Sequence, residues 1–125
     1  AVTPAGDALI VAKFIPAGLL RVSLPDGDSI TQVTLAGDAL PSPDGLVFFD
    51  GDLYAVSGEA VSRIRPEAGF NAAAVTVASQ VSGLSTATLA GDDIYVVKSE
   101  VVNFVLGAPL EIPFEIFRLD LSAFE

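Results

Sequence analysis

Short apolar runs alternate with turns along the whole chain, and the clearest example spans residues 40–56 (LPSPDGLVFFDGDLYAV). A turn at 43–45 precedes an apolar run at 46–49, and a second turn at 50–52 precedes another run at 53–56. Pro and Gly interrupt the pattern, and the runs between them are too short for helices. This stretch therefore predicts a strand, a tight turn and a second strand.

The same signals recur on both sides of this stretch. The one Ala-rich segment, 71–79, holds Val75, Thr76 and Val77, which favour a strand over a helix. A short extended start at 1–4 is followed by predicted strands at 8–12, 19–24, 29–35, 46–49, 53–57, 60–65, 73–78, 86–90, 94–99 and 114–121.

Three similar triplets reveal an internal repeat. Leu9, Leu53 and Ile94 begin them, 44 and then 41 residues apart. Three arginines, each followed by an apolar residue, share this spacing until a longer segment at 100–113 enlarges the third unit; they are Arg21, Arg63 and Arg118. A period of about 42 residues with four short strands per unit is typical of β-propeller blades.

The repeat predicts an all-β chain of about eleven strands, with blades at about 1–37, 44–79 and 85–121 and only three strands in the last. A β-sandwich gives no reason for such a repeat, and an α/β fold needs longer helical patterns. Three blades do not close a ring, because closed propellers use about four to eight. We therefore expect half of a six-bladed propeller, completed by a second copy as a homodimer or by a missing N-terminal half.

Composition excludes several kinds of chemistry. The chain has no His and no Cys, so it cannot build a Ser-His-Asp triad, a Cys-His dyad or the usual zinc site. Its net charge of -10 disfavours nucleic acid and anionic membranes as partners. No apolar run reaches 18 residues, so we expect a soluble acidic protein, with secretion or a periplasmic location left open.

The 43–46 segment (PDGL), followed by 50–54 (DGDLY), resembles the SMP-30/gluconolactonase-like family of six-bladed propellers. The 85–89 and 93–97 segments (STATL and DIYVV) look like the last blade of that family. The resemblance covers almost the whole chain but only the C-terminal half of a family member.

This resemblance implies a divalent cation, often calcium, at the mouth of the central channel, and hydrolysis of sugar lactones or related esters. The family's Asp of the PDG turn falls on Asp44, which is thus the candidate metal ligand and the candidate catalytic residue. The Glu and Asn ligands of the family belong upstream of Ala1. On this comparison the chain carries one ligand of the set and no autonomous catalysis is expected.

Asp44 has a simpler alternative role, which is to stabilise its own turn by accepting backbone hydrogen bonds. The 26–28 turn (DGD) lacks the remaining ligands of a calcium loop and predicts a hairpin. The remaining acids at hairpin tips are expected to be solvated turn residues: Asp50, Asp52, Asp92 and Asp93.

The third repeat supplies the candidate ligand-lining residues Ser85, Thr86, Lys98 and Asn103. Ser85 aligns with Asp44 of the second repeat, although no His is present to activate a serine. Lys98 is expected to pair with Glu100. The apolar segment 100–113 is expected to be a long loop that lines a ligand site, or whose residues 104–106 cover a blade face or a dimer contact.

Three functions remain open. The first is a half-propeller that assembles into a ring without catalysis. The second is a metal-dependent lactone or ester hydrolase whose site forms in the assembled channel. The third is a module that binds a small ligand or carbohydrate.

Overall fold

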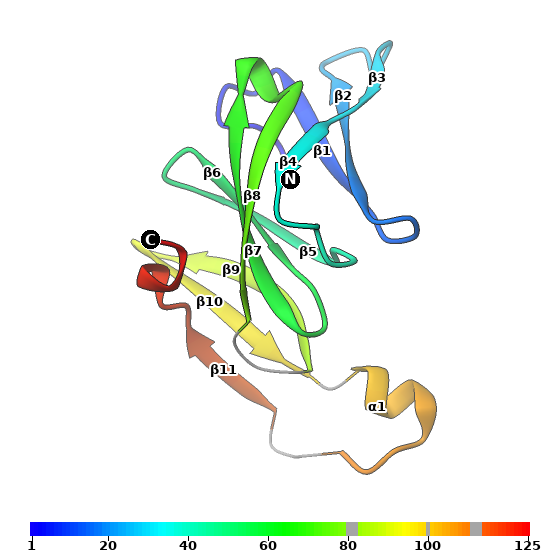
Figure 1. Ribbon diagram of the computed structural model, residues 1–125, viewed down its shortest axis with the longest axis vertical. Coiled ribbons are helices and arrows are strands. Elements are labelled where there is room, and N and C mark those ends of the chain that lie inside the picture. Colours follow the sequence, from blue (N-terminus) through cyan, green and yellow to red (C-terminus); the bar gives the residue numbers. More distant parts are fainter. Residues whose placement is uncertain (80–82, 100, 111–113) are drawn as a thin grey trace.

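The computed structural model describes residues 1–79, 83–99, 101–110 and 114–125, and Figure 1 shows an all-β arrangement. The described residues form three sheets. The strands are β1 Ala8–Lys13, β2 Gly18–Ser23, β3 Ile30–Gln32, β4 Thr34–Gly37, β5 Gly45–Phe49, β6 Asp52–Val56, β7 Ala60–Glu67, β8 Ala72–Ser79, β9 Leu84–Ala90, β10 Asp93–Lys98 and β11 Glu115–Arg118. The short helical segments are η1 Ala68–Phe70, α1 Val101–Leu106 and η2 Leu121–Phe124.

Each sheet contains an antiparallel meander whose strands follow chain order. Sheet 1 contains β1, β2 and β3, and a bridge from Val2 to Leu9 adds the first residues to its edge. Sheet 2 runs β5, β6, β7 and β8, with β4 added in parallel beside β8. Sheet 3 contains β9, β10 and β11 in the described residues. The predicted all-β class is confirmed, and the Ala-rich segment is a strand, as its β-branched residues predicted.

The hairpin turns follow from the residues that interrupt the strands. Asp50 and Gly51 both have positive φ, 47° and 82°, and they join Phe49 to Asp52 as a two-residue loop. That pair of conformations matches the twist of antiparallel strands, which is why Asp-Gly is common there. The predicted turns at 50–52 and 26–28 are confirmed, since the Gly27 N–H donates to the Ser23 carbonyl at 2.9 Å.

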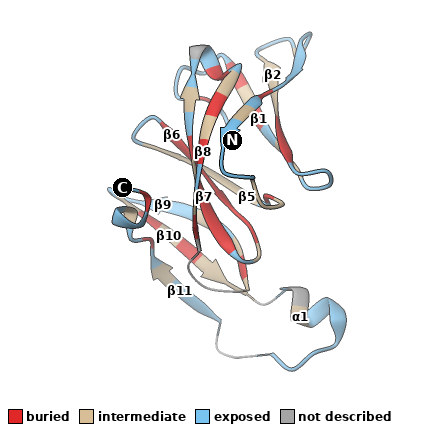
Figure 2. Cartoon of the chain, viewed as in Figure 1, coloured by how far each residue is buried: buried red, intermediate tan, exposed pale blue. Residues whose placement is uncertain are grey.

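Alternate residues of the central sheet enter two separate cores. Leu53 and Ala55 belong to the cluster shared with sheet 1, while Tyr54 and Val56 belong to the cluster shared with sheet 3. Every residue of β6 is therefore buried, and Figure 2 shows buried positions concentrated on sheet 2. Sheet 2 lies between the other two sheets, and its burial on both faces holds the molecule together.

The predicted repeat has a physical counterpart in the strand register. Ile10 pairs with Arg21, Tyr54 with Arg63, and Tyr95 with Arg118. Each of these arginines forms an ion pair with an aspartate in, or directly before, a neighbouring strand. The pairs are Arg21–Asp7 at 2.8 Å, Arg63–Asp52 at 2.5 Å and Arg118–Asp93 at 3.5 Å.

These ion pairs correct the expectation that Asp52 and Asp93 are merely solvated. Asp52 is only 7% exposed, and its hydrogen bond raises the pKa of Arg63. At the first sheet, a hydrogen bond from Thr3 and the charge of Arg21 lower the pKa of Asp7. The sequence signal for a turn was right, but turn position alone does not reveal a partner across the sheet.

Two predicted strands differ in extent. The strand expected at 29–35 divides at Val33, whose side chain is buried between sheets, so that β3 joins sheet 1 and β4 joins sheet 2. The strand expected at 114–121 ends at Arg118, and the chain turns into η2. There the Asp120 carboxylate accepts a hydrogen bond from the Ser122 N–H at 3.0 Å, and Phe124 packs edge-on against Tyr54.

The expected long loop at 100–113 instead begins with helix α1. The helix ends at Gly107, whose φ is +69°, and the Ala108 N–H donates to the Asn103 carbonyl at 2.8 Å. This hydrogen bond and that from Gly107 to Phe104 form a glycine-terminated helix end. The apolar side chains expected to cover a blade face do not do so, because Phe104, Val105 and Leu106 are each more than 70% exposed.

Leu53→Ala is expected to lower the free energy of unfolding by about 2 to 5 kcal/mol, because it leaves a cavity in the core between sheets 1 and 2. Leu106→Ala, on the exposed face of α1, is the matched control and is expected to change it by less than about 0.5 kcal/mol. Denaturant titration at one fixed protein concentration measures both. Equal losses would contradict the central position of β6.

Candidate functional site

A pocket of about 420 Å³ lies where the ends of all three sheets meet. Phe14 comes from the turn after β1, Asp44 from the segment before β5, and Glu59 from the turn after β6. Ser85, in β9, and Val101, at the start of α1, come from the third repeat and the segment after it. The remaining described lining residues are Pro41, Ser42, Ser57, Gly58, Gly83 and Leu84.

The meander explains why these segments meet. Successive turns lie at alternate ends of a meander, so the turn after the second strand of sheet 2 shares an end with the start of β5. The Asp44 N–H donates to the Val56 carbonyl at 2.8 Å, which fixes the segment before β5 to the end of β6. The Gly83 N–H donates to the Gly58 carbonyl at 2.8 Å and joins sheet 3 to the same place.

Two of the site residues predicted from the sequence line this pocket. Asp44 and Ser85 both line it, from different sheets. Within the described part of the chain, the Asp44 carboxylate accepts no hydrogen bond, so the backbone rather than this side chain holds its turn. The Ser85 hydroxyl donates to the Val97 carbonyl at 3.3 Å.

The other candidates lie elsewhere. Thr86, Lys98 and Asn103 are not among the described lining residues. Lys98 lies 4.0 Å from the Glu115 carboxylate, while Glu100, its expected partner, falls outside the described residues. Asn103 is in α1, and Thr86 lies against Gly45 at the contact between β9 and β5.

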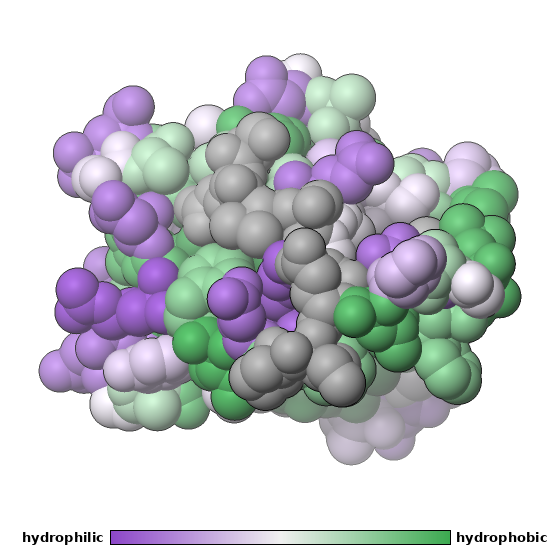
Figure 3. All heavy atoms as spheres, turned by 90° about the horizontal axis from the view of Figure 1, so that it is seen from below, coloured by the Kyte–Doolittle hydropathy of each residue, from purple (hydrophilic) through white to green (hydrophobic). Residues whose placement is uncertain are grey.

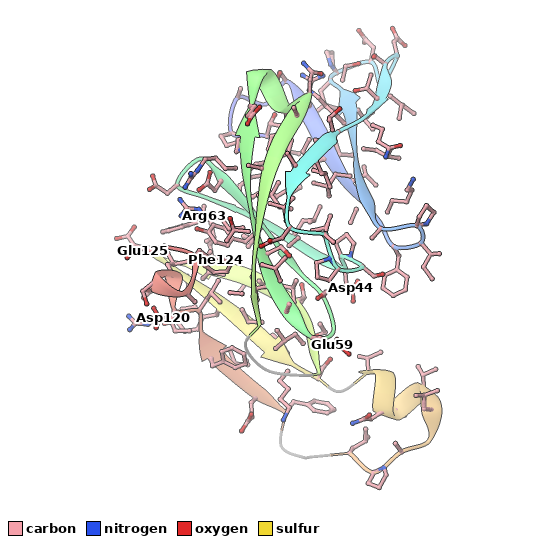
Figure 4. The ribbon with its side chains drawn as sticks, in the orientation of Figure 1. Asp44, Glu59, Arg63, Asp120, Phe124 and Glu125 are labelled. Atoms are coloured by element: carbon pink, nitrogen blue, oxygen red, sulfur yellow. The ribbon has the colours of Figure 1, made fainter. Side chains whose placement is uncertain are left out.

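Glu59 is the lining carboxylate that the sequence analysis missed. Figure 4 places Glu59 and Asp44 on the same side of the molecule, from the two neighbouring segments of sheet 2. The turn at Gly58 and Glu59 was recognisable in the sequence, and the meander puts it at the same end as Asp44. The repeat alone offered no such signal, because the corresponding turn of the first sheet contributes Phe14.

The pocket is negatively charged at its polar part and apolar at its walls. Asp44 and Glu59 carry the charge, while Phe14, Leu84 and Val101 form apolar walls. The hydroxyls of Ser57 and Ser85 are engaged with the backbone, since Ser57 bonds both the N–H and the carbonyl of Ala60 at 3.1 Å and Ser85 bonds the Val97 carbonyl. This combination suits a ligand with hydroxyl donors and an apolar face better than an anion.

The fit to the calcium implied by the family resemblance is incomplete within one chain. Calcium takes six to eight oxygen ligands, mostly carboxylates, carbonyls and waters. Among the described residues, no group of three or more acidic, His or Cys side chains is placed to hold a metal ion. Asp44 and Glu59 are two carboxylates, and no catalytic step through a metal follows from them.

The comparisons with known proteins leave the family open. No family model matches the chain, and no curated protein matches its sequence. Within the described residues, no helix is both long and apolar enough to cross a bilayer.

The contact between β5 and β9 beneath the pocket has no room for a side chain on Gly45. A Cβ there would lie 2.8 Å from the Thr86 Cα, which is closer than real Cβ contacts. Gly45→Ala is therefore expected to destabilise the fold by about 1 to 3 kcal/mol. Thermal unfolding followed by circular dichroism measures the change.

Gly58→Ala is the matched control, because nothing lies within 4 Å of its Cβ position. The control is expected to unfold close to the unchanged protein. A Gly45→Ala protein that unfolds at the same temperature as this control would show that sheets 2 and 3 are not closely packed at this point.

Proposed function

We propose that the chain is a three-blade half of a six-bladed β-propeller, and that it acts as an assembly module without catalysis of its own. One observation carries this proposal: three successive meanders repeat one strand register and pack in chain order, and each has an Arg–Asp ion pair, with the aspartate of the first meander one residue earlier than in the other two. Meanders that pack face to face in chain order are how propeller blades are arranged.

The close approach of β5 and β9 supports the same arrangement. These are the first strands of sheets 2 and 3, and blades converge at their first strands, around the central channel. A residue without a side chain at Gly45 lets the two backbones approach. The pocket at the ends of these strands would then lie at one mouth of the channel.

The lack of catalysis is argued from the chemistry of the pocket. The chain has no His or Cys, and the hydroxyls of Ser57 and Ser85 already bond backbone groups. A serine without an activating base is a poor nucleophile. The described lining residues also include no Lys or Arg to serve as a base or to hold an oxyanion.

The assembled ring predicts a mass in solution of twice the 12.8 kDa of one chain. Light scattering on a sizing column measures it, and small-angle scattering of the same peak should give the shape of a compact disc. A single species at the mass of one chain, unchanged up to high concentration, would contradict a ring made from two copies.

The pocket supports a second candidate function, which is binding of a small polyhydroxy ligand such as a sugar or sugar lactone. Carboxylates accept hydrogen bonds from sugar hydroxyls, and apolar walls pack against the ring carbons. The presence of Asp44 and Glu59 together with Phe14 and Val101 in the lining of one pocket favours this candidate.

Asp44→Asn is expected to weaken binding of such a ligand about tenfold or more, because hydrogen bonds to charged groups are worth about 1.5 to 3 kcal/mol. Calorimetry against a panel of sugars and sugar lactones measures the affinity. Asp92→Asn, an exposed turn acid outside the described lining, is the matched control. Equal affinity of the two variants would remove Asp44 from the site, whereas calcium-dependent turnover of a lactone would favour the hydrolase.

A further inference from the structure

The two end sheets each leave one face uncovered. Side chains of paired residues share a face of a sheet, as do alternate residues along a strand. The pairs of sheet 1 therefore gather one apolar set on its side away from sheet 2, here called the sheet-1 outer face. It consists of Val2, Leu9, Val11, Leu20, Val22 and Ile30.

The uncovered face of sheet 3 is found in the same way. Tyr95 pairs with Arg118, and Val97 pairs with Ile116, on the side away from the buried residues Ile94 and Val96. The sheet-3 outer face, as defined here, consists of Thr88, Tyr95, Val97, Ile116 and Arg118. Figure 3 views the molecule from the end at which Figure 1 draws β11 and α1, and shows hydrophobic and hydrophilic residues side by side there.

The internal register shows what normally covers the sheet-3 outer face. Leu19, Val61 and Ile116 occupy the same place in the three sheets, opposite Ala12, Val56 and Val97. The next sheet covers the first two, which are both 0% exposed, whereas Ile116 is 69% exposed. Ile116 thus occupies the position that a core residue has in sheets 1 and 2, but no following sheet covers it.

The sheet-1 outer face shows the complementary deficit. Val11, Ala55 and Val96 occupy equivalent places, and the preceding sheet covers the last two, at 2% and 0% exposure. Val11 is 37% exposed. Leu9 is partly exposed as well, although its equivalents Leu53 and Ile94 are buried.

We propose that the sheet-1 outer face of one chain packs on the sheet-3 outer face of a second copy, head to tail. This contact would continue the two contacts already present inside the chain, where an Ile10-type face always meets a Leu53-type face. Two copies would make two such contacts and close a ring, so the inference rests on the proposed ring assembly.

Head-to-tail pairing makes a prediction that pairing of like faces does not. In a two-copy ring, a substitution on either outer face alters both contacts, because every contact uses one face of each kind. If two sheet-1 outer faces packed together, substitutions on sheet 3 would have no effect. The two arrangements therefore differ in which substitutions matter and in what a mixture does.

The test uses Val11→Glu and Ile116→Lys, each at an exposed position that a monomer tolerates. Each variant alone is expected to dimerise at least 100-fold more weakly, because an unpaired charge enters both contacts. Mixing them is expected to restore a heterodimer to within about tenfold of the original affinity. One of its contacts is then unchanged, and the other joins Glu to Lys. Sedimentation velocity measures the association.

Phe104→Lys, an exposed apolar residue of α1 outside both faces, is the control and is expected to leave dimerisation unchanged. The inference is overturned if the unchanged chain dimerises and only one of the two face variants weakens it, if neither does, or if the mixture stays monomeric. An unchanged chain that stays monomeric instead overturns the proposed ring itself, and this inference with it.

A cross-linking measurement covers the case in which a charged variant fails to fold. The chain has no Cys, so Val11→Cys and Ile116→Cys each introduce one reactive thiol. A short bifunctional maleimide is expected to join the two variants to each other in a mixture. Cross-linking of Val11→Cys to itself, with none between the variants, would overturn head-to-tail pairing.

Discussion

Strand β6 sends Leu53 and Ala55 into one core and Tyr54 and Val56 into the other, and this alternation determines how the rest of the chain is arranged. A strand with polar residues on one face needs a single covering layer. A strand that is apolar on both faces needs two, so sheets 1 and 3 must lie on opposite sides of sheet 2. Burial on both faces therefore sets the order of the sheets along the molecule.

Sheets 1 and 3 lie at the two ends of the chain, and each is covered by another sheet on one face only. Ile10 and Leu19 of sheet 1, and Ile94 and Val96 of sheet 3, are buried against sheet 2. Their opposite faces carry residues of similar apolar character at the equivalent places. The sequence does not distinguish the covered faces from the uncovered ones. Each repeat carries apolar residues on both faces of its sheet, including the faces that no sheet of the same chain covers.

Local signals explain which parts of the fold were predictable. Asp50 and Gly51 define a turn by their own backbone preferences, and Val75 to Val77 favour a strand wherever they are placed. The division of β3 from β4 at Val33 depends on the burial of this side chain in the core between two sheets, which no local pattern reveals. Helix α1 was missed because segment 100–113 was expected to be a long loop, and a helix of six residues is too short to show a helical period.

The residues of the candidate site also separate into those that local sequence signals revealed and those that depend on the tertiary fold. Asp44 was found because the family resemblance of its Pro-Asp-Gly turn singled it out, and Ser85 because it aligned one repeat later. Glu59 comes from the turn after β6, which the meander places at the same end as Asp44, and the neighbouring Gly58 carbonyl accepts a hydrogen bond from the Gly83 N–H. Asp52 shows the limit of motif reasoning, since its role depends on Arg63, eleven residues away on the next strand.

Closure of the proposed assembly into a ring depends on the rotation between neighbouring sheets. A head-to-tail contact generates a ring only if its rotations add to a full turn, and otherwise it continues as a filament. Six equal sheets require a rotation of about 60° at every contact, within a chain and between copies. Because both copies carry a charge of -10, their repulsion opposes association and weakens as salt is added. In the proposed assembly, apolar contact must therefore supply the attraction. The number of copies in a ring would then report the rotation that the two internal contacts impose.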